Sequence, residues 1–125
     1  MNKVVYNACY GGFGLSDKAV KLYAELSGIK LFPLKDTYFT FWFLEDPKGR
    51  TVDQMFKDKA KDFYSRSIER HDPILIKVVE QLGDEANGEC AKLRIDTITG
   101  SQYKIDEYDG NETVVEPDGY DWKTV

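Results

Sequence analysis

The pattern of apolar and polar residues at the start of the chain changes from a strand-like run to a helical repeat. Residues 3–9 are mostly apolar and rich in β-favouring types, so we expect a strand there. Three glycines follow this run. Ser16 is a good N-cap, and apolar residues then recur at helical spacing as far as Gly28, which predicts a helix over residues 17–27. The N-terminal part is therefore predicted to run strand, glycine-rich turn, helix.

A second, long helix is predicted in the middle of the chain. Asp72 and Pro73 supply an N-cap followed by proline at the first helical position. An apolar stripe follows at helical spacing, formed by Leu75, Val78, Val79, Leu82 and Ala86. We expect this helix to end near Gly83 or Gly88, because glycine commonly follows the last helical residue.

Two further elements are predicted before this helix. Residues 37–44 are almost wholly aromatic or β-favouring, which indicates a well-buried strand. Residues 52–63 place their apolar side chains on one face and predict a helix. A mobile loop carrying a short helix fits the same segment, and the sequence leaves both alternatives open.

The C-terminal third of the chain alternates apolar and polar residues with the period of a strand. Leu93 and Ile95 share one face of such a strand, and so do Tyr103 and Ile105. Turn residues separate the runs, Gly100 first and then the hairpin pair Asp109-Gly110 before residues 113–115. These features predict a C-terminal antiparallel three-stranded meander. With the helices, they predict a single α+β domain over residues 1–125.

Charge and composition narrow the classes of partner. The chain has 125 residues, 42% of them hydrophobic, and a formal net charge of −5, which argues against a protein that grips nucleic acid by its phosphates. Seven acidic residues and no Lys or Arg lie between positions 106 and 121. A solvated edge is the favoured interpretation of this run, ahead of an acidic surface for a basic partner. No apolar run is long enough to span a bilayer, and we expect a cytoplasmic protein with Cys9 and Cys90 as free thiols.

The glycine-rich turn is the first candidate binding element. A turn between a strand and a helix can present free backbone N–H groups to a phosphate or carboxylate, aided by the helix dipole. The residues assigned to this candidate are Asn7, Tyr10, Gly11, Gly12, Phe13, Gly14 and Ser16. The turn matches neither the dinucleotide fingerprint nor a Walker loop. A tight turn whose glycines only permit positive φ is the slightly favoured alternative.

The second candidate is the segment 66–73, which holds two arginines and the only histidine before the long helix. The forks of Arg66 and Arg70 could clamp a phosphate, although ion pairing with nearby acids is the favoured interpretation. His71 and Asp72 suggest half of an acid–base pair, but adjacent residues rarely face one another. Asn87 follows the helix as a terminator that could also contact a nucleobase.

Catalytic and metal-binding groups are not predicted. Cys9, Cys90 and His71 could meet around zinc, but the chain has no CxxC or HxxxH spacing to support a zinc site. We therefore expect no catalytic residue, no metal and no cofactor.

Several segments resemble a family of small, mostly uncharacterised proteins of tailed phages and prophages. The similar segments cover roughly half the chain and are residues 6–16, 68–88, 92–95 and 107–110. This chain has His71 where the family usually carries an acidic residue, which weakens a catalytic role for that histidine. The resemblance implies a phage accessory protein, and some proteins of that class sequester nucleotide immune signals such as the cyclic ADP-ribose isomers of TIR (Thoeris) defence.

The leading hypothesis is therefore a non-enzymatic binding protein for a small nucleotide ligand. The glycine turn, Arg66 and Arg70 would hold the pyrophosphate, Tyr10 or Phe13 would stack on the base, and Asn7 and Asn87 would bind ribose or base. A pocket of that size is more easily built at a homodimer interface, so an oligomer is expected. The alternatives are an acidic inhibitor of a host protein, and a small nucleotide hydrolase that uses His71.

Overall fold

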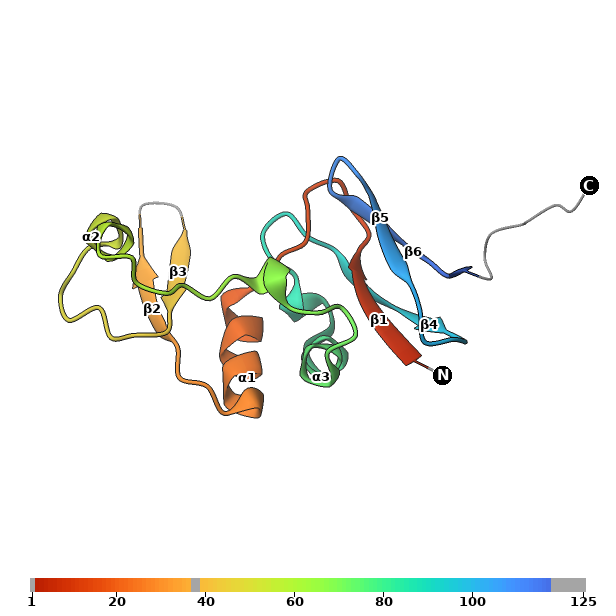
Figure 1. Ribbon diagram of the computed structural model, residues 1–125, viewed down its shortest axis with the longest axis horizontal. Helices are drawn as coiled ribbons and strands as arrows, with labels where there is room; N and C mark the ends of the chain where they lie inside the picture. The colour runs from red at the N-terminus through yellow and green to blue at the C-terminus, as the bar shows by residue number, and fades with distance from the viewer. Residues whose placement is uncertain (1, 37–38, 118–125) are drawn as a thin grey trace, which may run out of the picture.

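The computed structural model of the protein describes residues 2–36 and 39–117. Two helices, α1 (Asp17–Ser27) and α3 (Pro73–Leu82), pack together beside an antiparallel pair of strands, β1 (Asn2–Asn7) and β4 (Leu93–Ile98). A hairpin and a short helix lie at one end of the molecule, and a second hairpin lies at the other (Figure 1). The remaining elements are β2 (Phe32–Lys35), β3 (Thr40–Phe43), α2 (Val52–Lys57), β5 (Lys104–Tyr108), β6 (Asn111–Val115) and the 3-10 helices η1 (Ser65–Ser67) and η2 (Gly83–Ala86).

The helix α1 has the bounds that the sequence predicts. The Ser16 hydroxyl accepts a hydrogen bond from the Ala19 N–H at 3.1 Å, and Gly28 ends the helix with φ of 74°. These two local signals fix both ends, because one satisfies a free N–H and the other allows a left-handed residue.

The start of α3 is also confirmed. The Asp72 carboxylate accepts from the N–H of Ile74 at 2.8 Å, and Pro73 occupies the first turn. The Tyr23 hydroxyl of α1 donates to the same carboxylate at 2.8 Å, so this cap also joins the two helices. The main core lies between these helices and the β1–β4 pair, and includes Val5, Ala19, Tyr23, Leu75, Val78, Val79 and Leu93.

The predicted helix over residues 52–63 is only half as long in the structure. It ends after Lys57, because Lys59 adopts φ of 57° and the following residues run beside β3. There the Leu44 N–H donates to the Lys61 carbonyl at 2.9 Å and the Phe63 N–H donates to the Trp42 carbonyl. The segment therefore carries a short helix, as the second alternative has it, and its mobility stays a prediction.

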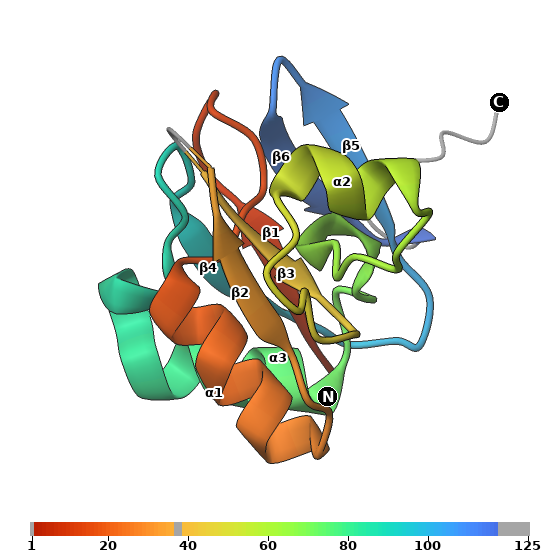
Figure 2. The same ribbon diagram turned by 90° about the vertical axis from the view of Figure 1, so that its left-hand side faces the viewer.

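A small second core supports this end of the molecule, which faces the viewer in Figure 2. Phe43, Met55 and Ala60 are buried together. Within the predicted strand over residues 37–44, β3 begins at Thr40, and positions 37 and 38 lie outside the described residues. Burial is uneven along this segment, since Phe43 is fully buried while Phe39 is 61% exposed.

The predicted three-stranded meander is wrong in its pairing. β4 pairs with β1, from Leu93 opposite Asn7 to Ile98 opposite Asn2, and β5 pairs only with β6 among the described strands. Pairing with β1 buries Leu93 and Ile98, whereas Ile105 of β5 stays partly exposed. The second turn is confirmed, because Asp109 and Gly110 have φ of 50° and 86°, as a tight hairpin requires. The mixed α+β composition of the fold is also confirmed.

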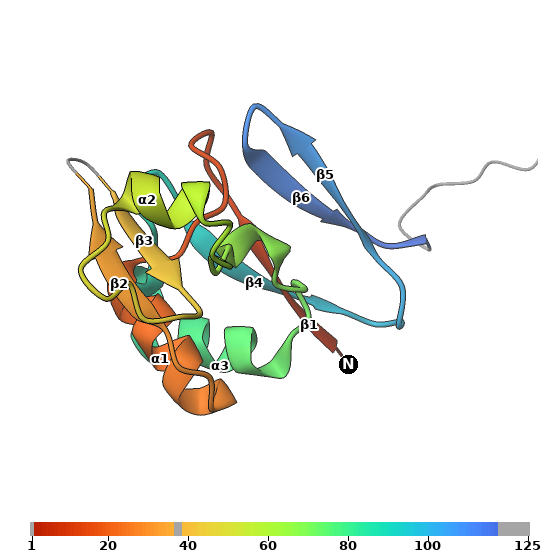
Figure 3. The ribbon, with the colours of Figure 1, turned by 60° about the vertical axis from the view of Figure 1, so that its left-hand side comes forward.

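A buried carboxylate attaches the β5–β6 hairpin to the rest of the molecule. Glu112 of β6 is 7% exposed and accepts from the Asn7 N–H at 2.8 Å. It also forms a bidentate ion pair with Arg70, with 2.9 Å between Nη2 and Oε2. The Arg70 guanidinium in turn lies 3.7 Å from the centre of the Phe13 ring. In Figure 3, β6 lies on the side of the hairpin that approaches β1, and β5 is the outer strand.

Among the described residues, no helix is long and apolar enough to cross a membrane.

The buried ion pair gives the first stability prediction. Glu112→Ala leaves the Arg70 charge buried without its partner, which costs about 3–5 kcal/mol of unfolding free energy. The midpoint of thermal unfolding should fall by roughly 10 °C or more. Lys18→Ala is the matched control, because Lys18 pairs with Glu85 at the surface, where such a pair contributes at most about 1 kcal/mol. Equal melting temperatures for the two variants would contradict this role of Glu112.

The Tyr23–Asp72 hydrogen bond gives a pH prediction. Burial, the hydrogen bond to Asp72 and the Asp72 charge raise the pKa of Tyr23 from 10.0 to about 12. A raised pKa favours the neutral phenol in the folded state, so its stabilising contribution is complete below pH 10 and is lost as the pH rises toward 12. Ultraviolet titration should show a late tyrosine transition that Tyr23→Phe reduces in amplitude and that Tyr108→Phe, at a residue 78% exposed, leaves unchanged. A late transition unchanged by Tyr23→Phe would disprove the assignment.

Candidate functional site

The candidate binding residues predicted from the sequence occupy three separate places in the structure. One group binds other parts of the chain and consists of the buried Asn7 and Phe13 and the partly buried Arg70. A second group borders a cavity of about 450 Å³ beside the glycine turn: Tyr10, Gly11, Gly12 and Arg66. The third group surrounds the start of α1: Gly14, Ser16 and Asn87. The structure therefore does not bring the ten residues together around one ligand.

Asn7 joins three segments of the chain. Its side chain is fully buried and donates to the carbonyls of Cys9 and Gly110, both at 2.8 Å. Its Oδ1 accepts from the Lys92 N–H at 2.8 Å. Every polar atom of this amide is thus bonded within the protein, and none is left for a ribose or base.

The glycines of the turn allow backbone segments to approach closely. A Cβ atom on Gly11 would overlap the carbonyl oxygen of Cys90. Gly12 has φ of 91° and faces the Arg66 guanidinium, and a Cβ on Gly110 would lie 2.6 Å from the Gly12 nitrogen. Steric need therefore explains these glycines without a ligand.

The start of α1 is occupied by groups of the protein itself. The Ser16 N–H donates to the Ala86 carbonyl at 2.9 Å, and the Gly88 N–H donates to the Gly14 carbonyl at 2.9 Å. Asn87 accepts the Leu93 N–H through its side chain at 2.8 Å. The Asp17 carboxylate, which accepts from the Trp42 indole at 3.4 Å, already places a negative charge where an anion would bind.

Phe13 and Arg70 shield one another from solvent. Phe13 is 4% exposed and its ring is covered by Arg70, so it does not offer a face to a base. The charge of Arg70 is neutralised by Glu112. Both residues therefore support the structure around the candidate site.

Arg66 differs from the other arginines in the chain. Arg50, Arg70 and Arg94 each form an ion pair with a carboxylate. Within residues 2–36 and 39–117, Arg66 has no carboxylate partner, and its Nε donates to the Phe13 carbonyl at 3.1 Å. This bond fixes the direction of the guanidinium, whose Nη2 lies beside Gly12. Glu107 and Asp109 border the cavity at that place, but neither carboxylate forms an ion pair with Arg66, so its terminal nitrogens remain for another acceptor.

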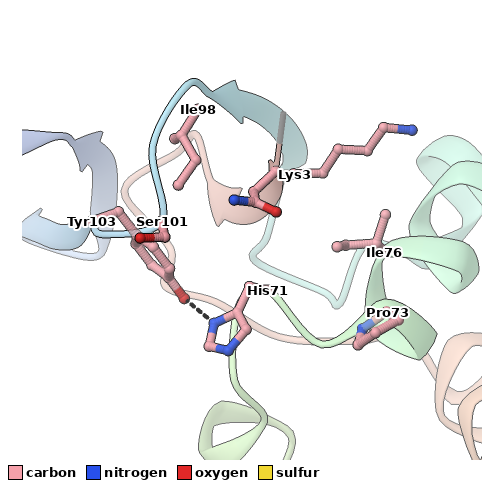
Figure 4. Close-up of a pocket in the computed structure, with 8 residues that line it drawn as sticks. Lys3, His71, Pro73, Ile76, Ile98, Ser101 and Tyr103 are labelled. Carbon is pink, nitrogen blue, oxygen red and sulfur yellow. Dashed lines mark hydrogen bonds between the residues drawn. The ribbon is translucent and has the colours of Figure 1, made fainter.

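Two neighbouring cavities lie beside the segment that begins at Arg66 and ends at Pro73. The first, which we call the loop cavity, has a volume of about 530 Å³. Its lining consists of Arg66, Ser67, Ile68, Glu69, Arg70, His71, Tyr103, Lys104 and Ile105. The second, which we call the groove, has a volume of about 570 Å³ and is lined by Asn2, Lys3, His71, Pro73, Ile76, Ile98, Ser101 and Tyr103 (Figure 4). His71 and Tyr103 border both cavities.

His71 pairs with Tyr103 and does not face Asp72. Its Nδ1 lies 2.7 Å from the Tyr103 hydroxyl, whereas the Asp72 carboxylate caps α3 and binds Tyr23. Burial and the Glu69 charge raise the pKa of Tyr103, against an opposing effect of Arg70, so its phenol stays protonated at neutral pH. In the tautomer with the proton on Nε2, the Tyr103 O–H donates to Nδ1 and the Nε2–H remains a donor.

The described residues contain no cluster of three or more His, Cys, Asp or Glu side chains that could hold a metal ion. Cys9 is partly buried and its thiol donates to the Cys90 carbonyl at 2.9 Å. Both cysteines are free.

The groove contains residues that the sequence did not single out. Pro73 was expected as the helix start and Tyr103 on a strand face, whereas Ile76 and Ile98 were given no role from the sequence. No local motif marks them, because the groove forms only where α3, β1 and the segment before β5 meet.

Comparisons with protein-family models, with curated proteins and with solved structures found no match to this chain. The similarity to phage and prophage proteins therefore stays a prediction from the sequence.

The glycine turn supplies a steric prediction. Gly11→Ala forces the Cys90 backbone to move, which should lower the unfolding free energy by about 1–3 kcal/mol in urea denaturation. Gly100→Ala is the control, because a Cβ there meets nothing within 4 Å and the backbone has no positive φ. That variant should stay within about 0.5 kcal/mol of the parent protein. A neutral Gly11→Ala would show that close packing does not explain this glycine.

Proposed function

We propose that the protein binds a nucleotide through its phosphate and sequesters it without chemical conversion. The observation that supports this proposal is the Arg66 guanidinium, which has no carboxylate partner among the described residues and borders the loop cavity. A planar guanidinium with free terminal N–H groups matches two oxygens of a phosphate.

The charges around the loop cavity support an anionic ligand of limited size. Arg66 is exposed on its lining, Lys104 on the same lining pairs with Asp106, and Arg70 is already neutralised by Glu112. Glu69 is the one acidic residue on the lining and opposes the anion. We therefore assign the main phosphate contact to Arg66 and a repulsive effect to Glu69.

The resemblance and the positions of the titratable side chains support sequestration over turnover. His71 is bonded to Tyr103, and the neighbouring Asp72 is bonded to the start of α3 and to Tyr23. A phage protein of this kind would inhibit host defence by removing a nucleotide signal of the ADP-ribose or cyclic nucleotide class. We propose that it acts in the host cytoplasm as a homo-oligomer.

Isothermal titration with ADP-ribose and cyclic dinucleotides tests this function. Arg66→Ala should weaken binding by roughly 10- to 100-fold, because a charge-assisted hydrogen bond contributes about 1.5–3 kcal/mol. Arg66→Lys should restore only part of the affinity, since lysine lacks the bidentate fork. Glu69→Gln should strengthen binding, because it removes a like charge.

The control for this titration is Arg94→Ala, which changes an arginine that pairs with Asp84 and lies outside the loop cavity. Its affinity should match that of the parent protein. No heat and no thermal shift with any ligand of the panel would disprove nucleotide binding. Ligand recovered in hydrolysed form would instead support the enzyme alternative.

The second candidate function is an acidic docking surface for a basic partner. The exposed acidic side chains of β5, the outer strand of the β5–β6 hairpin, favour it. Asp106 and Glu107 of β5 are exposed, and Tyr108 is 78% exposed beside them. Glu112 does not belong to this surface, because it is buried against Arg70. Glu116 accepts from the Thr99 N–H at 2.9 Å, and position 118 lies outside the described residues.

The double variant Asp106→Asn/Glu107→Gln separates the two functions. It should abolish binding of a lysine-rich peptide if β5 is the functional surface. If Arg66 carries the function, it should not weaken nucleotide affinity, because Glu107 borders a cavity that Arg66 also lines and its charge opposes an anion. Titration of the same variant with both kinds of ligand gives the answer.

A further inference from the structure

We infer that the groove holds the planar base of the ligand while Arg66 holds its phosphate, so that the ligand class is a nucleoside phosphate that spans both cavities. This inference rests on the proposed function and names the part of the ligand that the function leaves open. It also assigns a binding role to Ile76 and Ser101.

The lining of the groove has the character of a site for an aromatic heterocycle. Pro73 and Ile76 of α3 form one wall, and Ile98 at the end of β4 forms another (Figure 4). The Tyr103 ring adds an aromatic surface. Apolar walls with a few polar groups at defined places are typical of small-molecule sites.

The polar atoms around these walls suit the edge of a base. The Asn2 side chain donates to the Gly100 carbonyl at 2.8 Å, and its Oδ1 has no hydrogen-bond partner in the described part of the chain. Over the same residues the Ser101 hydroxyl and the His71 Nε2 also lack a partner. An acceptor, a hydroxyl and a ring nitrogen therefore remain for the hydrogen-bonding edge of a heterocycle.

A cationic contact to the base is not part of the inference. Lys3 belongs to the lining, but its ammonium points away from His71 and pairs with Glu80 at 2.6 Å (Figure 4). The groove is thus nearly neutral, in contrast to the loop cavity, where Arg66 forms no ion pair with any described residue. This difference sets the orientation of the ligand, with the phosphate in the loop cavity and the base in the groove.

The two cavities are neighbours because the same pair of side chains borders both. The hydrogen bond of 2.7 Å between His71 and Tyr103 forms their common wall, and the two rings meet at 76°. Volumes of about 530 and 570 Å³ each lie within the range of known ligand sites, roughly 300–1,000 Å³. The ribose would lie against His71 and Tyr103, between the two cavities.

Titration of the full chain with AMP and with ribose 5-phosphate tests the inference. Both probes carry the phosphate, and only AMP carries a base. AMP should bind at least about tenfold more tightly, as expected when a base gains stacking and apolar contacts. Arg66→Ala should weaken both probes.

A variant that fills the groove sharpens the test. Ser101 is exposed and lies outside the strands and helices, so Ser101→Trp can occupy the groove with little effect on folding, which a melting curve would verify. This variant should bind AMP no better than ribose 5-phosphate and should bind ribose 5-phosphate as the parent does. Thr113→Trp is the matched control, at an exposed position of β6 that does not line the groove, and it should keep the AMP preference.

The outcomes separate the two proposals. Equal affinity of the parent protein for AMP and ribose 5-phosphate would overturn the base site and leave phosphate binding intact. An AMP preference that survives Ser101→Trp would also overturn the base site. If neither AMP nor ribose 5-phosphate binds, the proposed function itself is overturned.

Discussion

The buried carboxylate of Glu112 is the interaction on which the candidate site depends. It accepts the Asn7 N–H, so that the end of β1 and the start of β6 are joined in the interior. It also neutralises Arg70, which allows that guanidinium to lie buried over the Phe13 ring. The Phe13 carbonyl then fixes Arg66 through Nε. The direction of Arg66 is thus set by a chain of contacts that begins at a residue far away in the sequence.

This chain of contacts gives the two arginines of one short segment different roles. Arg66 and Arg70 are four residues apart and look equivalent as a phosphate clamp. A carboxylate on β6 reaches only Arg70, and the cost of a buried, unpaired charge ensures that this pair forms. Arg70 therefore follows the ion-pair interpretation, whereas Arg66 keeps its guanidinium available for a ligand.

Local signals in the sequence predicted the elements whose ends are set by a single residue. The Ser16 and Gly28 caps, the Asp72 cap and the Asp109 turn all act on the backbone next to them. The pairing of β4 with β1, and the early end of α2 against β3, depend on residues distant in sequence, and alternation of apolar residues does not specify a partner strand. The groove also depends on residues distant in sequence, so the sequence around Tyr103 and Ile76 contains no local signal for it.

The net charge of −5 disfavours polyanionic ligands, an effect that the individual contacts do not show. An overall negative field repels polyanions at long range, while a guanidinium fixed in a cavity attracts a single phosphate at short range. The backbone of a nucleic acid would bring many phosphates against the exposed acids of β5, whereas a small nucleotide brings one or two to Arg66. Under the proposed function, the same acidic surface that argues against nucleic-acid binding would favour a small phosphate ligand, and Arg66, which has no carboxylate partner in the described residues, would determine where that ligand binds.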